Sequence, residues 1–534
     1  MIDAKTLQNI TQEGLKLLKK EKGLLEGVVY ASSNERTIGR IYYTTHIPST
    51  GLEEPKSDVD YGVNVEIWFK KNGKKLIGMG HEPNDMSISA VKRAIVKAKR
   101  DAVEDTEFGG FLKKHELPKM KNKTDNKKQK LLSLTSGEET ELLVQLSWDT
   151  IAGAVDALSA YAKEKKQTPK QLAFILNGDN FIIKERMALA TTNGIVDSDE
   201  TALVLSFLTA MLEKDNAKGS AWGAHVHIDD DFSAYDIGKH AALAAIDEVG
   251  GIRTSSGKYN VVFGHQAITE LFGSLLAPHM NLGMVDLGAS MFAKKYGQKV
   301  ASELLTLYDD ATLPGGAGSK RITCEGYPTG KTALIDHGRL VGYMTDYRTM
   351  NKILQNKKHG KEVLGVDPHE IRNAINPQNG FRFARGGGRV AASAVGVYAT
   401  NLVIESSQSV TPDELLKEVR DGIFIGRLWY TYPIGGYASG IISGTAIADC
   451  FTIKNGKLDQ PILPNTLRIE DNLGEMIQRI IGIANNQLPT INWASDEITH
   501  APWVGMKDVQ FYAINEEKKK TPHIVSLSKT AKKS

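Results

Sequence analysis

The chain has 534 residues, of which 41% are hydrophobic and 24% are charged. This composition is typical of a soluble globular protein of two or three domains and excludes a fibrous or largely disordered chain. Lys and Arg total 66 against 63 Asp and Glu, so the net charge gives no reason to expect nucleic-acid binding. Two cysteines are too few for a disulfide framework, and no apolar run approaches the ~18 residues of a membrane span. We therefore expect a cytoplasmic protein that contacts neither nucleic acid nor membrane.

Residues 61–69 alternate apolar and polar side chains, which predicts a half-buried strand. In this pattern Asn64 belongs to the polar face, opposite Val63 and Val65. The pair Asn72-Gly73 follows directly, and it predicts a hairpin turn because both residues tolerate a positive φ.

Three later segments have helical patterns. Apolar residues at helical spacing predict helices over 88–102, 148–165 and 236–249. Asp85 or Ser87 would cap the first of these helices, since both side chains can accept a hydrogen bond from a backbone N–H of the first turn.

Two basic segments interrupt the globular pattern. The first is a Lys-rich insertion near 111–130, and the second is the tail 515–534. No aromatic residues interleave the lysines of the insertion, which favours a solvated, mobile segment over a nucleic-acid arm. We expect the tail to be disordered.

The second half of the chain is rich in Gly and in short extended segments. Gly250-Gly251 breaks the preceding helical pattern, and we place a domain boundary there. The prediction is an α+β fold of two domains: an N-terminal layered domain, residues 1–249, and a β-dominated domain, residues 250–514.

The segment with the clearest chemical potential is 261–272, VVFGHQAITELF. A strand is expected to end near Gly264, followed by an amphipathic helix to about residue 276. His265 and Glu270 on this helix are potential metal ligands. Taken alone they are a weak signal, because a single His on an apolar helix is more often a packing residue.

Several short segments of the second half, in order along the chain, resemble the TldD/PmbA family, which is also labelled "modulator of DNA gyrase". The segments are Val300–Leu304, Tyr308–Asp310, Cys324–Gly326, Thr332–Ile335, Leu340–Asp346, Thr400-Asn401, Asp421–Phe424 and Ile453–Lys457. The resemblance covers residues 185 to 512 well. It implies a fold related to that of zinc peptidases with an HExxxH helix.

The resemblance places His265-Gln266-Ala267-Ile268-Thr269-Glu270 where the family has HExxxH. The first metal-binding His is kept, the general-base Glu is Gln266, and the second His is Glu270. The family's third ligand, a Cys, corresponds to Ala494 when counted back from Pro502. An amide has no useful basicity and an alanine cannot bind metal, so hydrolysis by the family mechanism is not expected.

This pattern resembles the PmbA (TldE) branch. The resemblance implies a non-catalytic or weakly active subunit that closes a peptidase chamber, pairs with a TldD-like catalytic paralogue, and binds unfolded or short peptides as an added strand. The alternative is a homodimeric scaffold that binds peptides without a catalytic partner. Nothing in the sequence indicates a gyrase-binding motif.

A second alternative is an active metallopeptidase with rearranged ligands. His265 and Glu270 would be joined by Glu497 or His500, which share a helix face if that stretch is helical. The i to i+5 spacing of His265 and Glu270 spans ~140° on an ideal α-helix, so both reach one metal only if the turn is distorted. Zinc would be bound only if these ligands assembled.

Two further motifs are open to more than one interpretation. The two imidazoles of His225-Val226-His227-Ile228-Asp229 would face one side of a strand, although polar residues on an outer face are favoured. Arg385-Gly386-Gly387-Gly388-Arg389 offers backbone N–H groups and two guanidinium groups to an anion. It lacks the Lys-Ser/Thr ending of a P-loop, which favours a flexible connection.

Overall fold

The computed structural model describes residues 2–47, 51–105, 107–118, 129–226, 232–384, 386–492 and 495–514. The basic tail and residues 119–128 of the Lys-rich insertion lie outside these ranges. None of the helices in the described ranges is long and apolar enough to cross a membrane.

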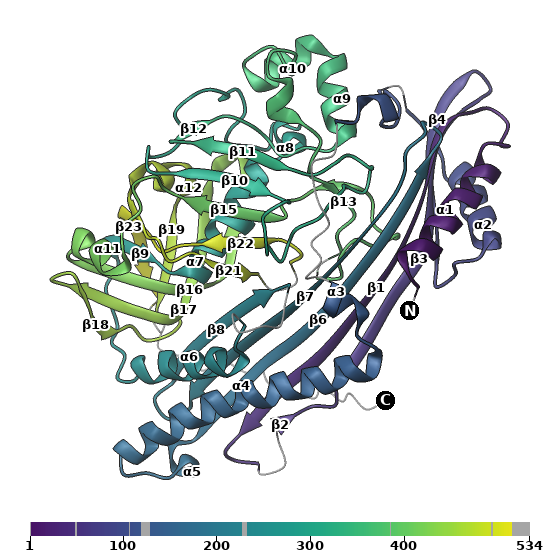
Figure 1. Cartoon of the computed structure of the whole chain (residues 1–534). Coiled ribbons are helices and arrows are strands. Elements are labelled where there is room, and N and C mark those ends of the chain that lie inside the picture. Colours follow the sequence, from purple (N-terminus) through teal and green to yellow (C-terminus); the bar gives the residue numbers. More distant parts are fainter. Residues whose placement is uncertain are drawn as a thin grey trace, which may run out of the picture.

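An antiparallel eight-stranded sheet dominates the N-terminal half (Figure 1). Its strand order is β5-β4-β3-β1-β6-β7-β8, with β2 paired to β1. The strands are β1 (Leu24–Thr44), β2 (Gly51–Leu52), β3 (Lys56–Lys71), β4 (Lys74–Pro83), β5 (Val103–Glu104), β6 (Phe174–Thr191), β7 (Val196–Leu212) and β8 (Ala217–His225). The predicted hairpin is confirmed: Lys71 pairs with Lys74, and Asn72 and Gly73 both have positive φ.

Four longer helices cover one face of this sheet, two at each end of the long strands (Figure 1). They are α1 (Ala4–Leu18), α2 (Ile88–Arg100), α4 (Ser136–Glu164) and α6 (Ala234–Asp247). The three helices predicted from spacing correspond to α2, α4 and α6. Ser87 rather than Asp85 caps α2, and α4 begins earlier than predicted, at a capping box of Thr135 and Glu138. Shorter helices are α3 (Gln129–Ser133), α5 (Pro169–Leu172) and the 3₁₀ turn η1 (Lys114–Glu116).

The second half of the chain covers the opposite face of the sheet, so the central strands are buried on both sides. On β1, Val29 packs with α1 and α2, whereas Val28 and Tyr30 belong to the core of the second half. The prediction that Asn64 lies on a polar outer face of β3 is therefore wrong. Asn64 is fully buried and donates a hydrogen bond to the carbonyl of Ala391 at 2.8 Å.

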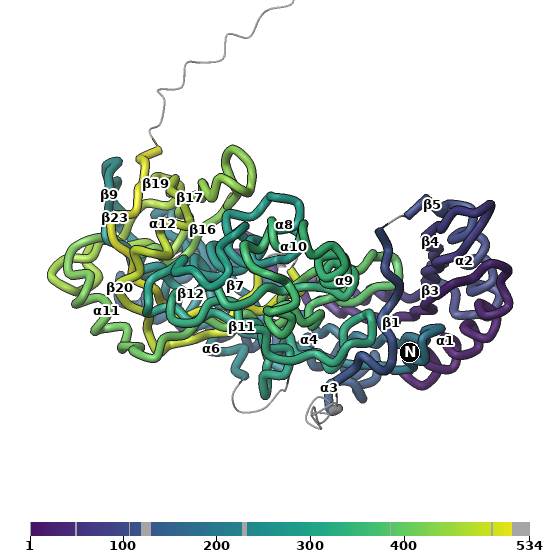
Figure 2. Tube along the Cα trace, turned by 90° about the horizontal axis from the view of Figure 1, so that it is seen from above, coloured from purple at the N-terminus to yellow at the C-terminus, as the bar shows by residue number. Residues whose placement is uncertain are grey.

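The second half contains a closed five-stranded barrel and a separate six-stranded sheet. The barrel order is β16-β9-β23-β19-β17, and pairing of β16 with β17 closes it. Its strands are β9 (Gly257–Phe263), β16 (Gly422–Pro433), β17 (Ile441–Lys454), β19 (Leu467–Asn472) and β23 (Val504–Ala513), flanked by β18 (Lys457–Pro461) and β20 (Ile480–Ile483). Figure 2 shows this region on the opposite side of the molecule from α1 and α2.

The six-stranded sheet has the order β12-β11-β10-β15-β22-β21. Its strands are β10 (Thr306–Asp310), β11 (Lys331–Asp336), β12 (Arg339–Leu340), β15 (Asn401–Glu405), β21 (Leu488–Ile491) and β22 (Ile498–Ala501), and β13 (Gly380–Phe381) pairs with β14 (Gly396–Val397). The helices of this half are α7 (His265–Ile268), η3 (Thr269–Leu276), η4 (Ala277–Met280), α8 (Leu282–Asp286), α9 (Tyr347–Gln355), α10 (Lys357–Leu364), η5 (Arg372–Ile375), α11 (Pro412–Val419), η6 (Tyr437–Ser439), α12 (Leu473–Met476) and η7 (Ile477–Arg479). The mixed α+β class predicted from the sequence is confirmed, and the boundary predicted at residues 249–250 falls between α6 and β9.

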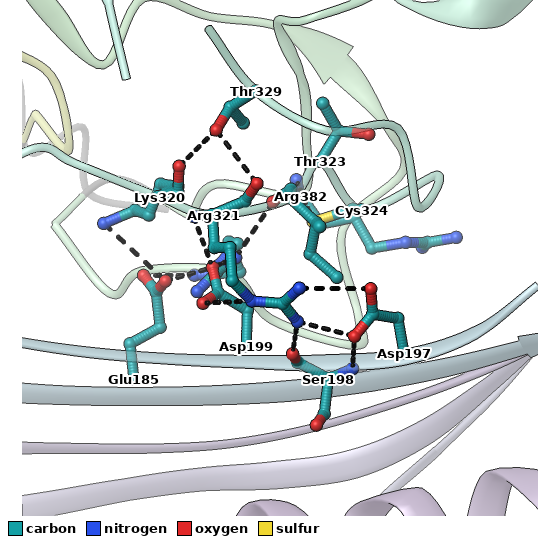
Figure 3. Close-up of polar contacts among 12 residues, drawn as sticks. Glu185, Asp197, Ser198, Asp199, Lys320, Arg321, Thr323, Cys324, Thr329 and Arg382 are labelled. Carbon is teal, nitrogen blue, oxygen red and sulfur yellow. Dashed lines mark hydrogen bonds and ion pairs between the residues drawn. The ribbon is translucent and has the colours of Figure 1, made fainter. Parts of the chain in front are cut away.

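A buried network of charges joins the sheet to the second half (Figure 3). Arg389 is fully buried; its Nη1 lies 2.8 Å from Asp199 Oδ2 on β7, and its Nε donates to Glu185 on β6. Lys320 lies 3.7 Å from the same Glu185 carboxylate, and Arg321 pairs with Asp197.

The positive charges of this network outweigh the cost of burying its carboxylates. Burial alone would raise the pKa of Glu185 and of Asp199, but Arg389, helped by Lys320 and Arg321, lowers both below their usual values. A buried ion pair is weak evidence for net stability, but removing one partner leaves an uncompensated charge. Loss of Arg389 would remove the nearest cation from both Glu185 and Asp199 and leave them only the longer contacts with Lys320 and Arg321.

Replacement of this guanidinium tests the network. We expect Arg389→Met to lower the free energy of unfolding by about 3–5 kcal/mol at neutral pH, measured by urea denaturation. Both carboxylates have lowered pKa values in the folded state, so the stability they contribute is present above about pH 4 and is lost as the pH falls. The difference from wild type should therefore shrink in acid. Arg420→Met is the control, because the Arg420 side chain is 77% exposed; an equal loss in both variants would contradict the role assigned to the network.

Candidate functional site

The helix that carries the predicted site begins where the barrel strand β9 ends. β9 lies between β16 and β23, and Gly264 is the N-cap residue of α7. A Cβ at Gly264 would lie 3.1 Å from the Cα of Gly426 on β16, so glycine allows the two chains to approach. The strand end and the helix near Gly264 were predicted from the sequence, and both are confirmed.

This helix changes its geometry after one turn. Residues His265–Ile268 are α-helical, and Thr269–Leu276 form a π-helix with i→i+5 hydrogen bonds. A π-helical segment is the kind of distortion that brings residues five positions apart closer to one face. The turn His265–Ile268 keeps α-helical geometry, however, so the distortion lies beyond the turn that separates His265 from Glu270 and does not bring these two side chains together.

The imidazole of His265 is held by the carbonyl of Ala501. Nδ1 lies 2.7 Å from that oxygen, and the ring packs 6.2 Å from the ring of Trp503. Burial lowers the pKa of His265, which favours the neutral ring. A neutral His that donates Nδ1–H to a carbonyl keeps Nε2 as a metal donor, and this is the arrangement of many zinc ligands.

Gln266 and Glu270 turn toward β16 instead. The amide oxygen of Gln266 accepts from Leu428 N at 3.0 Å, and its Nε2 donates to Glu270 Oε1 at 3.1 Å. Thr431 donates to the other oxygen of Glu270. Burial raises the pKa of Glu270, although Thr431, Arg427 and Gln266 oppose the rise. Both carboxylate oxygens are thus engaged by protein groups.

Arg427 was not selected from the sequence, although it affects Glu270 most among the charged residues nearby. Its guanidinium is buried and stacks against Phe207 at 5.7 Å, Trp222 at 5.3 Å and Trp429 at 5.3 Å. Such stacking suits the planar, weakly hydrated guanidinium. Only the three-dimensional contact of β16 with β7 and β8 brings these rings together.

The two additional ligands of the rearranged site lie on a strand and the loop before it, not on a helix. Residues 498–501 form β22, whose Thr499 faces η3, where a Cβ on Gly273 would lie 2.8 Å from Thr499 Oγ1. Adjacent strand residues face opposite sides, so His500 points away from the helix. His500 Nε2 lies 3.4 Å from Asn401 Oδ1, and burial lowers its pKa to about 4. The Glu497 carboxylate binds Ser495 and the N–H of Asp496.

Zinc does not fit these donors. A catalytic zinc takes three protein ligands, and among the described residues no group of three or more His, Cys, Asp or Glu side chains is placed to hold a metal. Position 494 itself lies outside the described residues, but an alanine side chain has no donor atom. The two cysteines, Cys324 and Cys450, are buried, and neither belongs to the helix.

The triple-glycine motif does bind an anion, and the anion is a side chain of the same protein. Gly386 N and Gly388 N donate to the two carboxylate oxygens of Asp496 at 2.9 and 2.7 Å. Asn34 Nδ2 donates to the carbonyl of Gly387 at 2.9 Å. The flexible connection that we favoured from the sequence is therefore wrong for residues 386–389, whereas Arg385 lies outside the described residues.

The other motif, at 225–229, is only partly covered. His225 is the last residue of β8, and His227 and Asp229 lie outside the described residues. The interpretation as polar residues on an outer strand face stays a prediction.

The barrel strand β9 runs directly into the helix that begins at His265, and this region lies within a metallopeptidase-related domain. Residues 256–512 match the model of the PmbA/TldA metallopeptidase C-terminal domain. The chain is 26% identical over 444 residues to the metalloprotease TldD homolog of Buchnera aphidicola, covering 78% of this chain and 82% of that protein. It is 25% identical over 317 residues to the TldD homolog of Haemophilus influenzae, covering 57% and 58%.

The structure matches that of TldE from Thermococcus kodakarensis with a TM-score of 0.72 at 17% identity, covering 95% of this chain and 100% of that one. The match shows a shared fold. The chain belongs to the TldD/PmbA family of metallopeptidase-related proteins.

The carboxylate of Asp496 gives a testable pH dependence. Burial raises its folded-state pKa to about 6, above the ~3.9 of an unfolded Asp. Its stabilising contribution is therefore complete below about pH 4 and is lost as the pH rises through 6. Relative to Asp496→Asn, which cannot ionise, wild type should lose roughly 2 kcal/mol of unfolding free energy between about pH 4 and pH 7. A constant difference in unfolding free energy between the two proteins across that range would show that the Asp496 carboxylate does not titrate while it is bound by Gly386 and Gly388.

Proposed function

We infer that this chain is a peptide-binding subunit that does not hydrolyse peptides on its own and that pairs with a TldD-like hydrolytic homologue. The observation that carries this inference is the state of Gln266. Its amide replaces the general base, and both of its ends are occupied, by Leu428 N and by Glu270. An amide cannot take a proton from a metal-bound water.

The surroundings of the helix support the same proposal. The ring of His265 is oriented by the carbonyl of Ala501, but Glu270 is bound to Gln266 and Thr431, and His500 faces Asn401. A single oriented imidazole does not hold a zinc ion firmly. These contacts also disfavour the active metallopeptidase with rearranged ligands.

Peptide binding by strand addition has a structural basis beside the same helix. β21 is the terminal strand of the six-stranded sheet as described, and its Thr490 contacts Thr269 of the helix. An extended peptide that pairs with such an edge is bound through its backbone and tolerates many side chains. In the proposed assembly this chain closes the chamber and presents the peptide to the partner. A homodimer would present it without cleavage.

A cleavage assay tests whether this chain needs a hydrolytic homologue to cleave peptides. The purified chain should not cleave an unfolded peptide in a zinc-supplemented, chelator-controlled reaction, whereas addition of an HExxxH homologue from the same genome should produce cleavage. The matched control is the homologue without this chain, which should be at least about tenfold slower if the heteromeric complex is the active form. Chelator-sensitive cleavage by the chain alone would overturn the proposal, and equal rates with and without the chain would favour the homodimeric scaffold.

A restoration variant tests the placement of the site. Gln266→Glu, Glu270→His and Ala494→Cys together should supply the base and the two missing ligands, and we expect close to one equivalent of zinc by metal analysis after dialysis. The control carries Glu270→Gln in place of Glu270→His and should bind far less zinc. Failure of the triple variant to bind zinc while it melts like wild type would show that the motif is misplaced.

A further inference from the structure

A cavity of about 340 Å³ lies beside β3 and β4 of the N-terminal sheet. Its walls come from β3 and β4, from residues 108–112, and from the N-terminus of α9. The volume falls within the ~300–1,000 Å³ of small-molecule sites. None of its lining residues belongs to α7, η3, β21 or β22, so the cavity is separate from the predicted metallopeptidase site.

One side of the cavity is apolar and rigid. Phe108 and Phe111 pack edge to face with ring centroids 4.9 Å apart, and Phe108 also packs on Trp68 at 5.2 Å. Val28 and Leu112, both buried, complete this wall. Such a wall fits one aliphatic or aromatic side chain of a ligand.

The lining also contains the carboxyl group of Glu325, which forms no ion pair within the described part of the chain. Glu325 accepts a hydrogen bond from Tyr347 N at 2.8 Å, is partly exposed, and lines the cavity. The neighbouring carboxylates are already engaged: Asp346 caps α9 through Thr349 N at 2.7 Å, and Glu66 pairs with Arg382.

The cations of the lining are engaged as well. Arg382 binds Glu66 and the carbonyl of Ser393, and Arg348 lies 3.1 Å from Asp105. Arg382 is 1% exposed, and its Nε has no hydrogen-bond partner among the described residues. Both guanidinium groups therefore already have carboxylate partners, which leaves Glu325 as the charged group of the lining that can take a new partner.

We propose that this cavity binds the amino end of a peptide, with the α-ammonium group on Glu325 and an apolar first side chain against Phe108 and Phe111. This assignment deepens the proposed peptide binding and rests on it for the natural ligand. It would anchor a peptide by its terminus, whereas strand addition at β21 binds the backbone further along.

Electrostatics around Glu325 agree with this assignment. Burial raises the pKa of Glu325 well above its usual value, and the negative charges of Asp346 and Glu66 raise it further. The buried thiol of Cys324 lies on the preceding residue, and burial raises its pKa too, so it adds no charge at neutral pH. Burial and these charges therefore favour the neutral carboxyl in the absence of a cation, and a bound ammonium group would favour its ionised form and the release of a proton.

The experiment is calorimetric titration of the full chain with L-phenylalanine amide, which has an ammonium group, a carbonyl and an apolar ring. We expect saturable binding that is lost for N-acetyl-L-phenylalanine amide, which lacks only the charge. The binding enthalpy should vary with the ionisation enthalpy of the buffer, because a proton is released from Glu325. Each of these measurements uses the chain without any partner, so failure of the hydrolytic pairing would not affect them.

Two variants locate the binding site. Glu325→Gln mimics the protonated side chain, should keep the fold, and should weaken binding about tenfold or more while abolishing proton release. Ala394→Trp fills the exposed mouth of the cavity without changing its charges and should also abolish binding. Glu303→Gln, whose parent side chain is 75% exposed, is the control and should bind like wild type.

The proposal is overturned by equal affinity for the amide and its N-acetyl form, by an unchanged affinity in Glu325→Gln, or by absence of saturable binding to wild type. If Glu325→Gln does not fold, Ala394→Trp and the comparison of the two ligands on wild type still decide. Binding of the probe together with failure of the cleavage assay would keep the amino-end site and reject the hydrolytic partnership.

Discussion

The fold depends on burying the inner face of the long N-terminal sheet against the second half of the chain. Charged side chains on that face have no access to water, so each must meet its counter-charge there. Arg389 satisfies this requirement for two adjacent strands at once, through Glu185 on β6 and Asp199 on β7. It thereby fixes where the loop 386–389 lies on the sheet. That loop in turn binds Asp496, two residues before β22 begins.

The position of the loop 386–389 also affects the candidate site, because β22 connects the two. β22 ends at Ala501, whose carbonyl holds the ring of His265. A buried ion pair on the sheet and the orientation of an imidazole on the barrel helix are thus linked by one loop and one short strand. Such a chain of packed and hydrogen-bonded elements has little freedom to shift one end alone.

Local signals in the sequence predicted local structure well. The turn at Asn72-Gly73 and the helix beginning at Ser87 follow from φ preferences and from capping, which are properties of a few neighbouring residues. Burial of Asn64 did not follow, because the residue that satisfies it, Ala391, is far away in the sequence. The cavity beside Glu325 is also assembled from distant segments, and no single stretch of sequence contains its pattern. At the predicted site the sequence did not give the directions of the side chains: His500 lies on a strand and turns away from the helix.

The structure also shows that a glutamine and a glutamate could occupy position 266 without disturbing the fold, which bears on the resemblance-based placement of the catalytic Glu there. Gln266 Oε1 accepts a hydrogen bond from Leu428 N, a role that a carboxylate oxygen of the same shape can fill equally well. The neighbouring Nε2 then requires an acceptor, and Glu270 supplies one where the family motif has a histidine. The two departures from the motif are therefore chemically matched: the amide contributes a donor, and the carboxylate receives it. If the motif is placed as the sequence resemblance implies, a hydrogen-bonded pair that holds the helix on β16 stands where the motif has a base and a metal ligand, and the barrel and its helix are kept in either case.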